Sequence, residues 1–446
     1  MPPERIGPTS KGAEMRLAKE IALLLTVDSL RRDHVGCYGG QGFTPFLDAL
    51  AERSAVFEGA CSQGGGTPES FRSIMFALPP PFRLEERHVN GEESIAKVLK
   101  EAGYATGGFH SNPFLSSHFG YDEGFETFFD GGGGRTGGTT LLTDLGNAAS
   151  IALLNRGPAA DGMEITSKAL KWAKEARSPA FLWVHYMDTH FPYLPPARTQ
   201  GWWGSLRNRV TWDLLMAKRI QSRVGEPPEG VRSSVLSSYR LCVQEVDSYI
   251  STLVEGVGKR FDRRLVIVTA DHGEGFWERG RFGHTGVYDE ILRVPLIVSS
   301  TGTGLGLRVR GLATLADIKP TILKHAGLAH EGGLPLTAGE VVPAGRKIVC
   351  SSLDPPDGTR TLGVRSESLK YIRKESLDGR EWISEELYDL ERDPGEKVNI
   401  LASRKEEASA AKAVLEEALA RSVSQAGMDK FDEAEVAQRL RALGYD

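Results

Sequence analysis

Cysteine is scarce in this sequence, and the few cysteines form no pattern. The 446 residues include four of them, Cys37, Cys61, Cys242 and Cys350, and none belongs to a C-x-x-C pair. This spacing excludes a zinc ribbon and a disulfide framework. It therefore predicts a reducing, cytoplasmic location.

Charge of one sign and long apolar runs are lacking as well. The 54 basic and 59 acidic side chains give a formal net charge of −5, which is too mild to indicate a nucleic-acid partner. The apolar run in MRLAKEIALLLTV, which starts at Met15, is too short to cross a bilayer, so we predict no membrane span. No small-x-small cleavage site follows that run, which argues against a signal peptide.

Glycine, by contrast, is abundant. Its 51 residues make up about 11% of the chain, against a usual ~7%. The excess predicts many tight turns, and two groups of glycines stand out: Gly64–Gly66, just before Thr67, and the glycines around His284.

Short apolar runs that alternate with helical patterns predict the fold class. The runs typical of buried strands are Ile21–Val27, Ala105–Phe109, Ala180–His185, Leu265–Ala270 and Val294–Ser299. Helical patterns cover Thr44–Arg53, Glu92–Ala102, Glu164–Ala176 and Ser237–Val257. This alternation predicts an α/β fold, a doubly wound and mostly parallel sheet with helices on both faces.

Changes in this rhythm predict the domain organisation. We expect a loose N-terminal tail over 1–19 and a catalytic α/β domain over 20–346, with an insertion at about 197–234. Shorter strands then indicate a small antiparallel α+β subdomain over 347–403, and an alanine-rich, charged helical tail over 404–446.

Polar side chains follow the predicted strands where each strand ends. The pairs are Asp28 and Ser29, His110 and Asn112, Asp188 and His190, and Asp271 and His272. Ligands of such sheets bind beyond the carboxyl ends of the strands, so these side chains mark a candidate site. One acidic residue after a strand is usually a helix cap, but four such ends are harder to explain in that way.

Three of these residues make a plausible set of metal ligands. Asp28, Asp271 and His272 combine carboxylates with an imidazole, which favours one zinc or manganese ion, with calcium or magnesium as alternatives. Thr67 is the candidate fourth ligand and nucleophile, because a metal helps to remove a hydroxyl proton.

The loop before Thr67 suits an anionic substrate. Gly64–Gly66 let the backbone approach closely, and Pro68 fits the first position of a helix for which Thr67 would be the N-cap. The positive end of the helix dipole favours negative charge there, and Ser70 is a candidate substrate-binding residue.

At this point the chain resembles a family, the sulfatases of the alkaline phosphatase superfamily. The similar strings, in the family's order, are VDSLRRDHVGCYG, GGGTPESFRSIM, HYMDTHFPY, TADHGEGF, GHTGVYDEILRVPLIV, GVRSESLKYI and ELYDLERDPGEKVNI. The resemblance implies that Asp28, Asp271 and His272 bind a divalent metal and that Thr67 is the nucleophile. It also implies that four residues face the anionic ester group: His110, Asn112, His190 and His284.

The sequence departs from the family at several of these positions. Thr67 replaces the Cys or Ser that sulfatases convert to an aldehyde, a chemistry that a secondary alcohol does not fit. Arg72 lies one position later than the family's arginine. Histidines stand where sulfatases have two lysines, at His110 and His284. Ser29 stands at the aspartate next to Asp28, and His272 at the usual metal-binding asparagine.

The predicted activity is hydrolysis of a phosphoester through Thr67, with a phosphodiester or phosphonate monoester favoured. His190 or His284 would protonate the leaving oxygen, and His110 and Asn112 would hold the ester oxygens. The partner would be a small-molecule, glycan-derived or lipid-derived anionic ester.

Four alternatives stay open. The chain could be a sulfatase that acts without the aldehyde, a transferase of phosphoryl head groups, or a non-catalytic binding protein of the same fold. His110, His190 and His284 could also hold a second metal together with Asp188.

Overall fold

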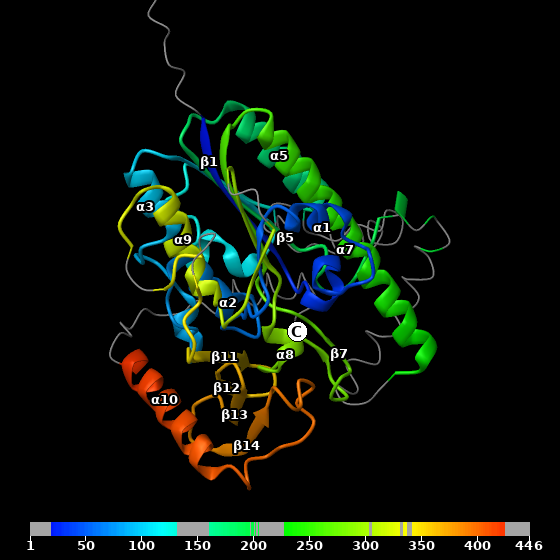
Figure 1. The fold of residues 1–446 in the computed structure, drawn as a ribbon, viewed down its shortest axis with the longest axis vertical. Helices are drawn as coiled ribbons and strands as arrows, with labels where there is room; N and C mark the ends of the chain where they lie inside the picture. Colours follow the sequence, from blue (N-terminus) through cyan, green and yellow to red (C-terminus); the bar gives the residue numbers. More distant parts are fainter. Residues whose placement is uncertain are drawn as a thin grey trace, which may run out of the picture.

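In the described residues, the computed structural model has two large β-sheets that lie one above the other (Figure 1) and a two-stranded sheet of β7 (Gly275–Phe276) and β8 (Phe282–Gly283). The described residues are 19–131, 160–196, 227–302, 306–330, 333–336 and 341–423, with 198, 199, 201 and 204. The predicted N-terminal tail, most of the insertion at 197–234 and the end of the C-terminal tail therefore lie outside the described residues. No helix in the described part of the chain is long and apolar enough to cross a membrane.

The larger sheet has eight strands in the order β10-β2-β9-β6-β1-β5-β3-β4. Their bounds are β1 Glu20–Val27, β2 Ala55–Phe57, β3 Ala105–His110, β4 Thr127–Asp130, β5 Ala180–Tyr186, β6 Arg263–Ala270, β9 Leu296–Ser300 and β10 Leu307–Val309. The central strand β1 pairs in parallel with β5 and β6, and Val27 lies level with Tyr186 and Ala270. This register brings Asp28 and Asp271, which follow β1 and β6, to the same height at the carboxyl edge.

The prediction of a mostly parallel, doubly wound sheet is confirmed. One strand differs in direction: β9, predicted from Val294–Ser299, runs antiparallel to both β6 and β2. Its apolar pattern fits either direction, because a strand buried on both faces looks alike in parallel and antiparallel pairs.

Helices cover both faces of this sheet (Figure 1). One layer contains α1 (Pro45–Ala51), α5 (Gly162–Glu175) and α7 (Glu229–Gly258). The other contains α2 (Thr67–Phe76), α3 (Ile95–Glu101) and α9 (Ile318–His325). The central strands β1, β5 and β6 between them are almost wholly apolar and buried, so the core forms as two apolar layers on one sheet.

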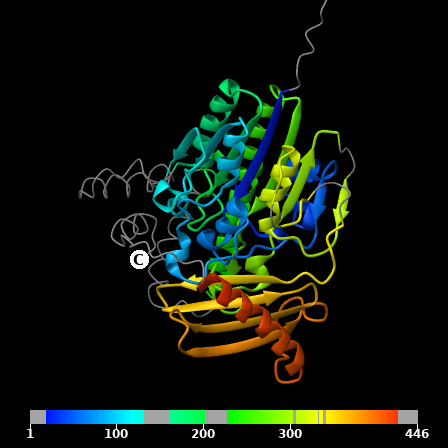
Figure 2. The ribbon, with the colours of Figure 1, turned by 90° about the vertical axis from the view of Figure 1, so that its left-hand side faces the viewer.

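The smaller sheet is antiparallel, in the order β11-β12-β13-β14. Its strands are β11 Ile348–Asp354, β12 Thr359–Arg365, β13 Leu369–Ser376 and β14 Trp382–Asp389. Helix α10 (Lys405–Val423) lies across this C-terminal sheet (Figure 2) and buries Ala408 and Leu415 against it.

The C-terminal sheet also touches the loop that precedes α2. Gly65 N donates to the carbonyl of Ser351 at 2.9 Å, and Ser351 N donates to that of Gln63 at 3.0 Å. This backbone pairing places β11 beside the glycine-rich segment, so the small sheet borders the candidate site.

Candidate active site

Two carboxylates and an imidazole meet at the carboxyl edge of the large sheet. Asp28, His185 and Asp271 each offer a ligand atom within 4.8 Å of the others, and all three side chains are fully buried. They follow or end the three central strands β1, β5 and β6. The parallel register therefore builds this group from residues far apart in sequence.

His272 borders the same two carboxylates. Its Nε2 lies 3.8 Å from Asp28 Oδ1 and 3.6 Å from Asp271 Oδ2. Its Nδ1 lies 2.8 Å from the carbonyl of Gly273, which can only accept, so Nδ1 carries the proton. The lone pair of a neutral His272 is therefore at Nε2, facing the carboxylates.

His185 is held in a similar way. Its Nδ1 lies 3.0 Å from Thr26 Oγ1, and its Nε2 lies 3.5 Å from Asp28 Oδ2. Among the described residues, neither His185 Nε2 nor His272 Nε2 has a hydrogen-bond partner, although both atoms are buried. A buried imidazole nitrogen without a partner is costly, and coordination of a cation would satisfy it.

The charges of this group also fit a cation. Burial alone would raise the pKa of Asp28, but His190, His185 and His272 outweigh it and hold the pKa well below its usual range. Burial and the charge of Asp28 raise the pKa of Asp271, because two buried carboxylates repel each other. A divalent cation between them would relieve that repulsion.

Ser29 holds the two carboxylates in place. Its Oγ donates to Asp28 Oδ1 at 2.8 Å, and its backbone N donates to Asp271 Oδ1 at 3.2 Å. Its φ of 55° lies in the left-handed region that few residues other than glycine adopt. Backbone strain of this kind is common where a functional group must be aimed.

Thr67 lies directly against this group. Its Oγ1 is 3.0 Å from Asp271 Oδ2 and 3.2 Å from Asp28 Oδ2, and the side chain is only 5% exposed. The predicted N-cap role is wrong, since Gly66 is the N-cap and Thr67 is the first residue of α2, with no side-chain cap. The Thr67 hydroxyl is therefore not used for capping and points at the carboxylates.

The loop before Thr67 is packed so closely that only glycine fits. A Cβ added to Gly65 would lie 2.3 Å from the carbonyl oxygen of Gly286 and 2.8 Å from Ser352 Cβ. The predicted substrate-binding residue Ser70 is fully buried beneath this loop, and its Oγ donates to the carbonyl of Gly66 at 2.9 Å. In this structure Ser70 supports the loop.

Asn112 contacts the Thr67 hydroxyl. Its Oδ1 accepts from Phe114 N at 2.9 Å, which fixes the orientation of the amide. Its Nδ2 donates to Asp28 Oδ2 at 2.9 Å and to Thr67 Oγ1 at 3.2 Å. Because Asn112 donates to Thr67, the single Thr67 proton is left for a carboxylate.

His110 is fully buried behind the group. Its ring stacks on Trp183, with 5.4 Å between ring centroids, and lies 4.9 Å from Phe128. Burial, and then the nearby His185, lower the pKa of His110 to about 3. His110 is therefore neutral near pH 7 and supplies no positive charge to the site.

His190 and His284 form a pair over His272. Their ring centroids are 5.3 Å apart, and His284 lies 4.5 Å from His272. His190 Nδ1 lies 2.5 Å from the carbonyl of Phe191, so that nitrogen carries a proton. Burial and then the repulsion from His284 outweigh the attraction of Asp28, and the pKa of His190 is lowered.

His284 differs from His190 through its partner. Its Nδ1 lies 3.4 Å from Glu274 Oε1, and the other oxygen of that buried carboxylate accepts from Tyr193 at 2.7 Å. Burial alone would lower the pKa of His284, but Glu274 outweighs it and raises the pKa. The pKa of His190 is therefore lowered, whereas the pKa of His284 is raised.

The structure gives Arg72 a role outside the site and does not bring the possible second metal set together. Arg72 donates to the carbonyls of Pro79 at 3.1 Å and Glu86 at 2.7 Å, so it holds the loop after α2. The proposed second metal set of His110, His190, His284 and Asp188 does not come together in the described residues, where Asp28, His185 and Asp271 are the one such group.

His185 and Glu274 are the residues whose roles the sequence analysis missed. From the sequence, His185 is predicted only to be the last residue of a buried strand. The available signal was a polar ring at the end of an otherwise apolar run, level with Thr26 and therefore two residues before Asp28 on the neighbouring strand.

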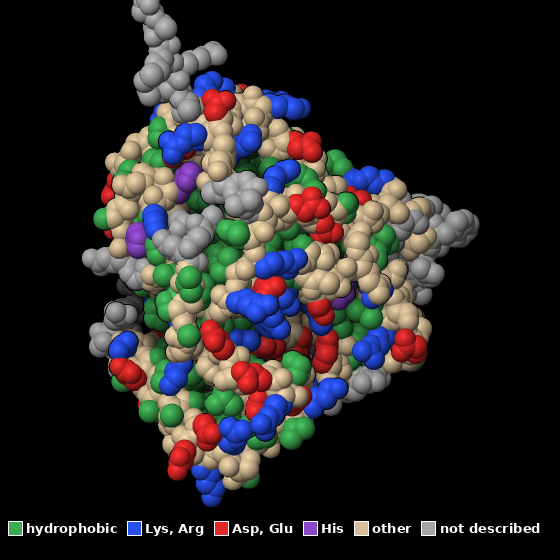
Figure 3. Space-filling view, in the orientation of Figure 1, with side chains coloured by type: hydrophobic (Ala, Val, Ile, Leu, Met, Phe, Trp, Pro, Cys, Tyr) green, Lys and Arg blue, Asp and Glu red, His purple; other side chains and the backbone are tan. Residues whose placement is uncertain are grey.

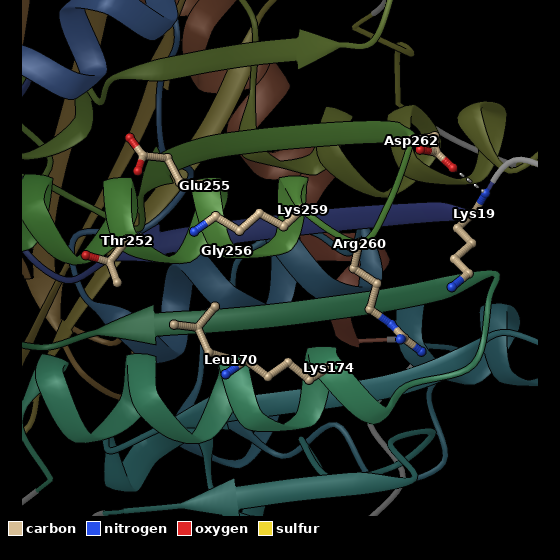
Figure 4. A pocket seen from close by; sticks show the side chains of 9 residues that line it. All are labelled: Lys19, Leu170, Lys174, Thr252, Glu255, Gly256, Lys259, Arg260 and Asp262. Atoms are coloured by element: carbon tan, nitrogen blue, oxygen red, sulfur yellow. Dashed lines mark hydrogen bonds between the residues drawn. The ribbon is translucent and has the colours of Figure 1, made fainter.

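A cavity lies at the end of the large sheet that is opposite to Asp28 and Asp271. It has a volume of about 730 Å³ and opens between α5 and α7, beside Lys19, which directly precedes β1 (Figure 4). Its basic side chains are Lys19, Lys174, Lys259 and Arg260. None of its described lining residues is a histidine. The cavity is remote from the carboxyl ends of the strands, where ligands of such folds bind.

The raised pKa of Asp188 predicts how the stability of the protein depends on pH. Its Oδ1 accepts from Gly162 N at 3.2 Å, and burial, followed by repulsion from Asp161 and Glu245, raises its pKa to about 7. The unfolded chain ionises near pH ~4, so stability falls as the pH rises from about 4 to 7. Asp188→Asn should therefore raise the free energy of unfolding at pH 8 by about 1–2 kcal/mol, since the side chain is only partly shielded.

Urea unfolding at pH 4 and pH 8 measures this effect. The gain from Asp188→Asn should be small at pH 4, where the carboxyl is protonated in the folded state and about half protonated in the unfolded chain. Glu101→Gln, at an exposed position, is the control and should change little at either pH. An equal gain at both pH values would contradict the raised pKa.

Comparison with known proteins gives a consistent family. A family model described as Sulfatase matches residues 21–328. Human arylsulfatase K is 24% identical over 350 residues, covering 68% of this chain and 63% of that protein. Choline-sulfatase of Rhizobium meliloti is 25% identical over 260 residues, covering 51% and 47%. The chain thus spans from about half to just under two thirds of the length of these curated relatives.

The same architecture occurs in solved structures. Phosphonate monoester hydrolase of Agrobacterium radiobacter matches with a TM-score of 0.68 at 19% identity, over 91% of this chain and 96% of that chain. At this level of identity, the match establishes the shared fold.

Proposed function

Because the chain belongs to the sulfatase family, we propose that it is a metal-dependent hydrolase that cleaves a singly charged phosphoester through Thr67. A phosphodiester or a phosphonate monoester is the favoured substrate. The observation that carries the proposal is the buried Thr67 hydroxyl, held between Asp271 and Asp28 and oriented by Asn112.

The residues that would hold the metal are Asp28, Asp271, His272 and His185, with Thr67 beside them. Carboxylates mixed with imidazoles favour zinc or manganese over calcium or magnesium. When bound, the cation would act as a Lewis acid that stabilises negative charge on Thr67 Oγ1 and on the ester oxygens.

The first step forms a bond between Thr67 Oγ1 and phosphorus. The Thr67 proton passes to Asp271, whose Oδ2 is 3.0 Å away, and the bond from phosphorus to the leaving oxygen breaks. His284 gives its proton to that oxygen, because Glu274 favours the charged form of His284 and the His284 side chain is 22% exposed. The products of this step are Thr67 esterified to the phosphorus, which keeps its second organic group, and a free alcohol.

The second step releases the phosphoryl group to water. His190 is suited to remove the water proton, since its Nδ1–H is held by a carbonyl and its Nε2 lone pair is retained by the lowered pKa. Water then bonds to phosphorus as the Thr67 Oγ1 bond breaks, and Asp271 returns the proton to Thr67. Two histidines with oppositely shifted pKa values suit one acid and one base role.

The charge of the site favours a singly charged ester. Sulfatases have two lysines where this chain has His110 and His284, and the buried His110 is neutral near pH 7. The site therefore has less fixed positive charge for the two negative charges of a phosphomonoester. A phosphodiester, a phosphonate monoester and a sulfate ester each carry one negative charge.

A panel of aryl esters tests the proposal. We expect metal-loaded protein to hydrolyse a 4-nitrophenyl phosphodiester or phosphonate monoester faster than the matching phosphomonoester, and to lose turnover after treatment with a chelator. Intact mass during turnover should show a phosphoryl adduct on Thr67. Faster turnover of the sulfate ester would instead favour sulfatase activity, as the names of the curated relatives indicate.

A further inference from the structure

A buried tyrosine of α7 holds the turn that follows Asp28. The hydroxyl of Tyr239 donates to the carbonyl of Ser29 at 2.7 Å and accepts from the backbone N of Arg31 at 2.8 Å. The directions of both bonds are fixed, because a carbonyl only accepts and a backbone N–H only donates. Tyr239 therefore ties the two ends of this turn together.

The ring of Tyr239 is itself held by aromatic neighbours. It meets three other rings edge to face, with ring centroids 5.0 Å away in His34, 5.0 Å in Tyr193 and 4.9 Å in Phe276. Tyr239 is also fully buried. The ring is thus fixed on several sides, so its hydroxyl has a fixed position relative to Ser29.

Ser29 uses each of its polar groups. Its backbone N and its Oγ donate to Asp271 Oδ1 and Asp28 Oδ1, and its carbonyl accepts from Tyr239. The φ of 55° at Ser29 is costly for a residue with a side chain, and such a conformation persists only where the surroundings impose it. Tyr239 imposes it from the carbonyl side of the residue.

The bonds from Ser29 decide which oxygen of each carboxylate is left for a cation. Both of its donors are directed at Oδ1 atoms, so the Oδ2 atoms remain for the imidazoles. Asp28 Oδ2 lies 3.5 Å from His185 Nε2. Asp271 Oδ2 lies 3.6 Å from His272 Nε2. A change in the backbone of Ser29 would therefore release both carboxylates at once.

The surface charge gives no other source of attraction for a cation. Acidic and basic side chains are interspersed over the face that Figure 3 shows, and the formal net charge is only −5. A mixed surface of this kind does not concentrate ions of one sign. The affinity of the site for a cation then depends on how well its ligands are aimed.

We propose that Tyr239 is a positioning residue of the cation site: it holds Ser29 in the left-handed conformation that aims Asp28 and Asp271. Tyr239 acts through Ser29 and is not itself a ligand. This inference rests on the proposed function, because it concerns the affinity of the same site for its metal.

Tyr239→Phe tests the inference, because it keeps the ring and removes only the hydroxyl. Full-length protein is freed of metal with a chelator and titrated with Co²⁺, whose visible absorption reports the geometry of its ligands. We expect the affinity for Co²⁺ to fall by about tenfold, which is about 1.4 kcal/mol and within the range for residues that orient metal ligands. The absorption of bound Co²⁺ should change as well, and calorimetric titration with Zn²⁺ should show the same loss.

Ser29→Gly separates this effect from a general loss of structure. Glycine adopts a positive φ readily, so a glycine at this position should not need Tyr239. Tyr239→Phe should therefore lower the affinity by less than about threefold in the Ser29→Gly background. Ser29→Ala provides a further test if Tyr239→Phe folds poorly. It loses the same Oγ as Ser29→Gly but resists a positive φ, so it should bind Co²⁺ less tightly than Ser29→Gly.

Tyr38→Phe is the matched control. The Tyr38 hydroxyl also bridges a backbone carbonyl and a backbone N, both of Leu296 on β9. Tyr38→Phe should lower the urea midpoint about as much as Tyr239→Phe and leave the affinity for Co²⁺ unchanged. Equal affinity of the wild type and Tyr239→Phe, or an equal loss in both backgrounds, would overturn the inference alone. A wild type that binds neither Co²⁺ nor Zn²⁺ would instead contradict the proposed metal site.

Discussion

Thr67→Ala should lower kcat for the best ester by about 10⁴-fold or more, because it removes the oxygen that we propose forms the covalent bond. The hydroxyl has no second role in capping α2, since Gly66 is the N-cap, so the helix should keep its start. The loss should therefore be in chemistry, with little change in the folded structure. Steady-state kinetics and the thermal unfolding midpoint of the same preparation measure the two effects separately.

Thr67→Ser is the matched control for this prediction. It keeps a hydroxyl at the same position and loses only a methyl group, so activity should stay within about 10–100-fold of the wild type. Intact mass should show a phosphoryl adduct on the serine variant and none on the alanine variant. Undiminished turnover of Thr67→Ala would exclude Thr67 as the nucleophile.

The sequence was most informative where local pattern and chemistry coincide. Buried apolar runs predicted β1, β5 and β6, and polar residues at their ends predicted that Asp28 and Asp271 would meet. Strand direction is not encoded locally, so the antiparallel β9 could not be distinguished from a parallel strand. The three-residue strands β2 and β10 exist only through their pairing with each other and, for β2, with β9.

The site was harder to predict than the fold because its details depend on side-chain packing. His185 looked like part of a buried strand, and only the register of β1 and β5 reveals that it reaches Asp28. Ser70 was predicted to bind substrate from its place near Thr67, yet its hydroxyl is turned inward to Gly66. Neither orientation follows from spacing along the chain.

The second large effect is expected at Asp289, which joins the part of the chain that forms the large sheet to the C-terminal sheet. Its carboxylate accepts from Arg365 Nε at 3.0 Å and Nη2 at 3.1 Å, and from Lys370. Lys370 Nζ also lies 2.8 Å from Glu396 Oε1, and Glu396 Oε2 accepts from Asp289 N at 2.7 Å. All four residues are less than 10% exposed, so these charges depend on one another.

Asp289→Ala should lower the free energy of unfolding by about 3–5 kcal/mol, because it leaves two buried cations with one carboxylate. Burial alone would raise the pKa of Asp289, but Lys370 and Arg365 outweigh it and hold that pKa below its usual range. The contribution is therefore fully present above pH ~4, the unfolded value, and is lost as the pH falls below it. Urea unfolding at pH 7 and at pH 3 measures both effects.

The exposed Asp378 offers a matched control in the same subdomain. Its carboxylate lies 3.5 Å from Arg380 Nε, and the two side chains are 55% and 87% exposed. Surface pairs of this kind contribute little, so Asp378→Ala should change the urea midpoint only slightly. A comparable, small effect of both substitutions would show that the buried charges do not hold the C-terminal sheet in place. We expect a large loss of stability for Asp289→Ala alone. Turnover should fall as well, because α8 (Asp289–Leu292), which begins at this residue, directly follows the segment that carries His284.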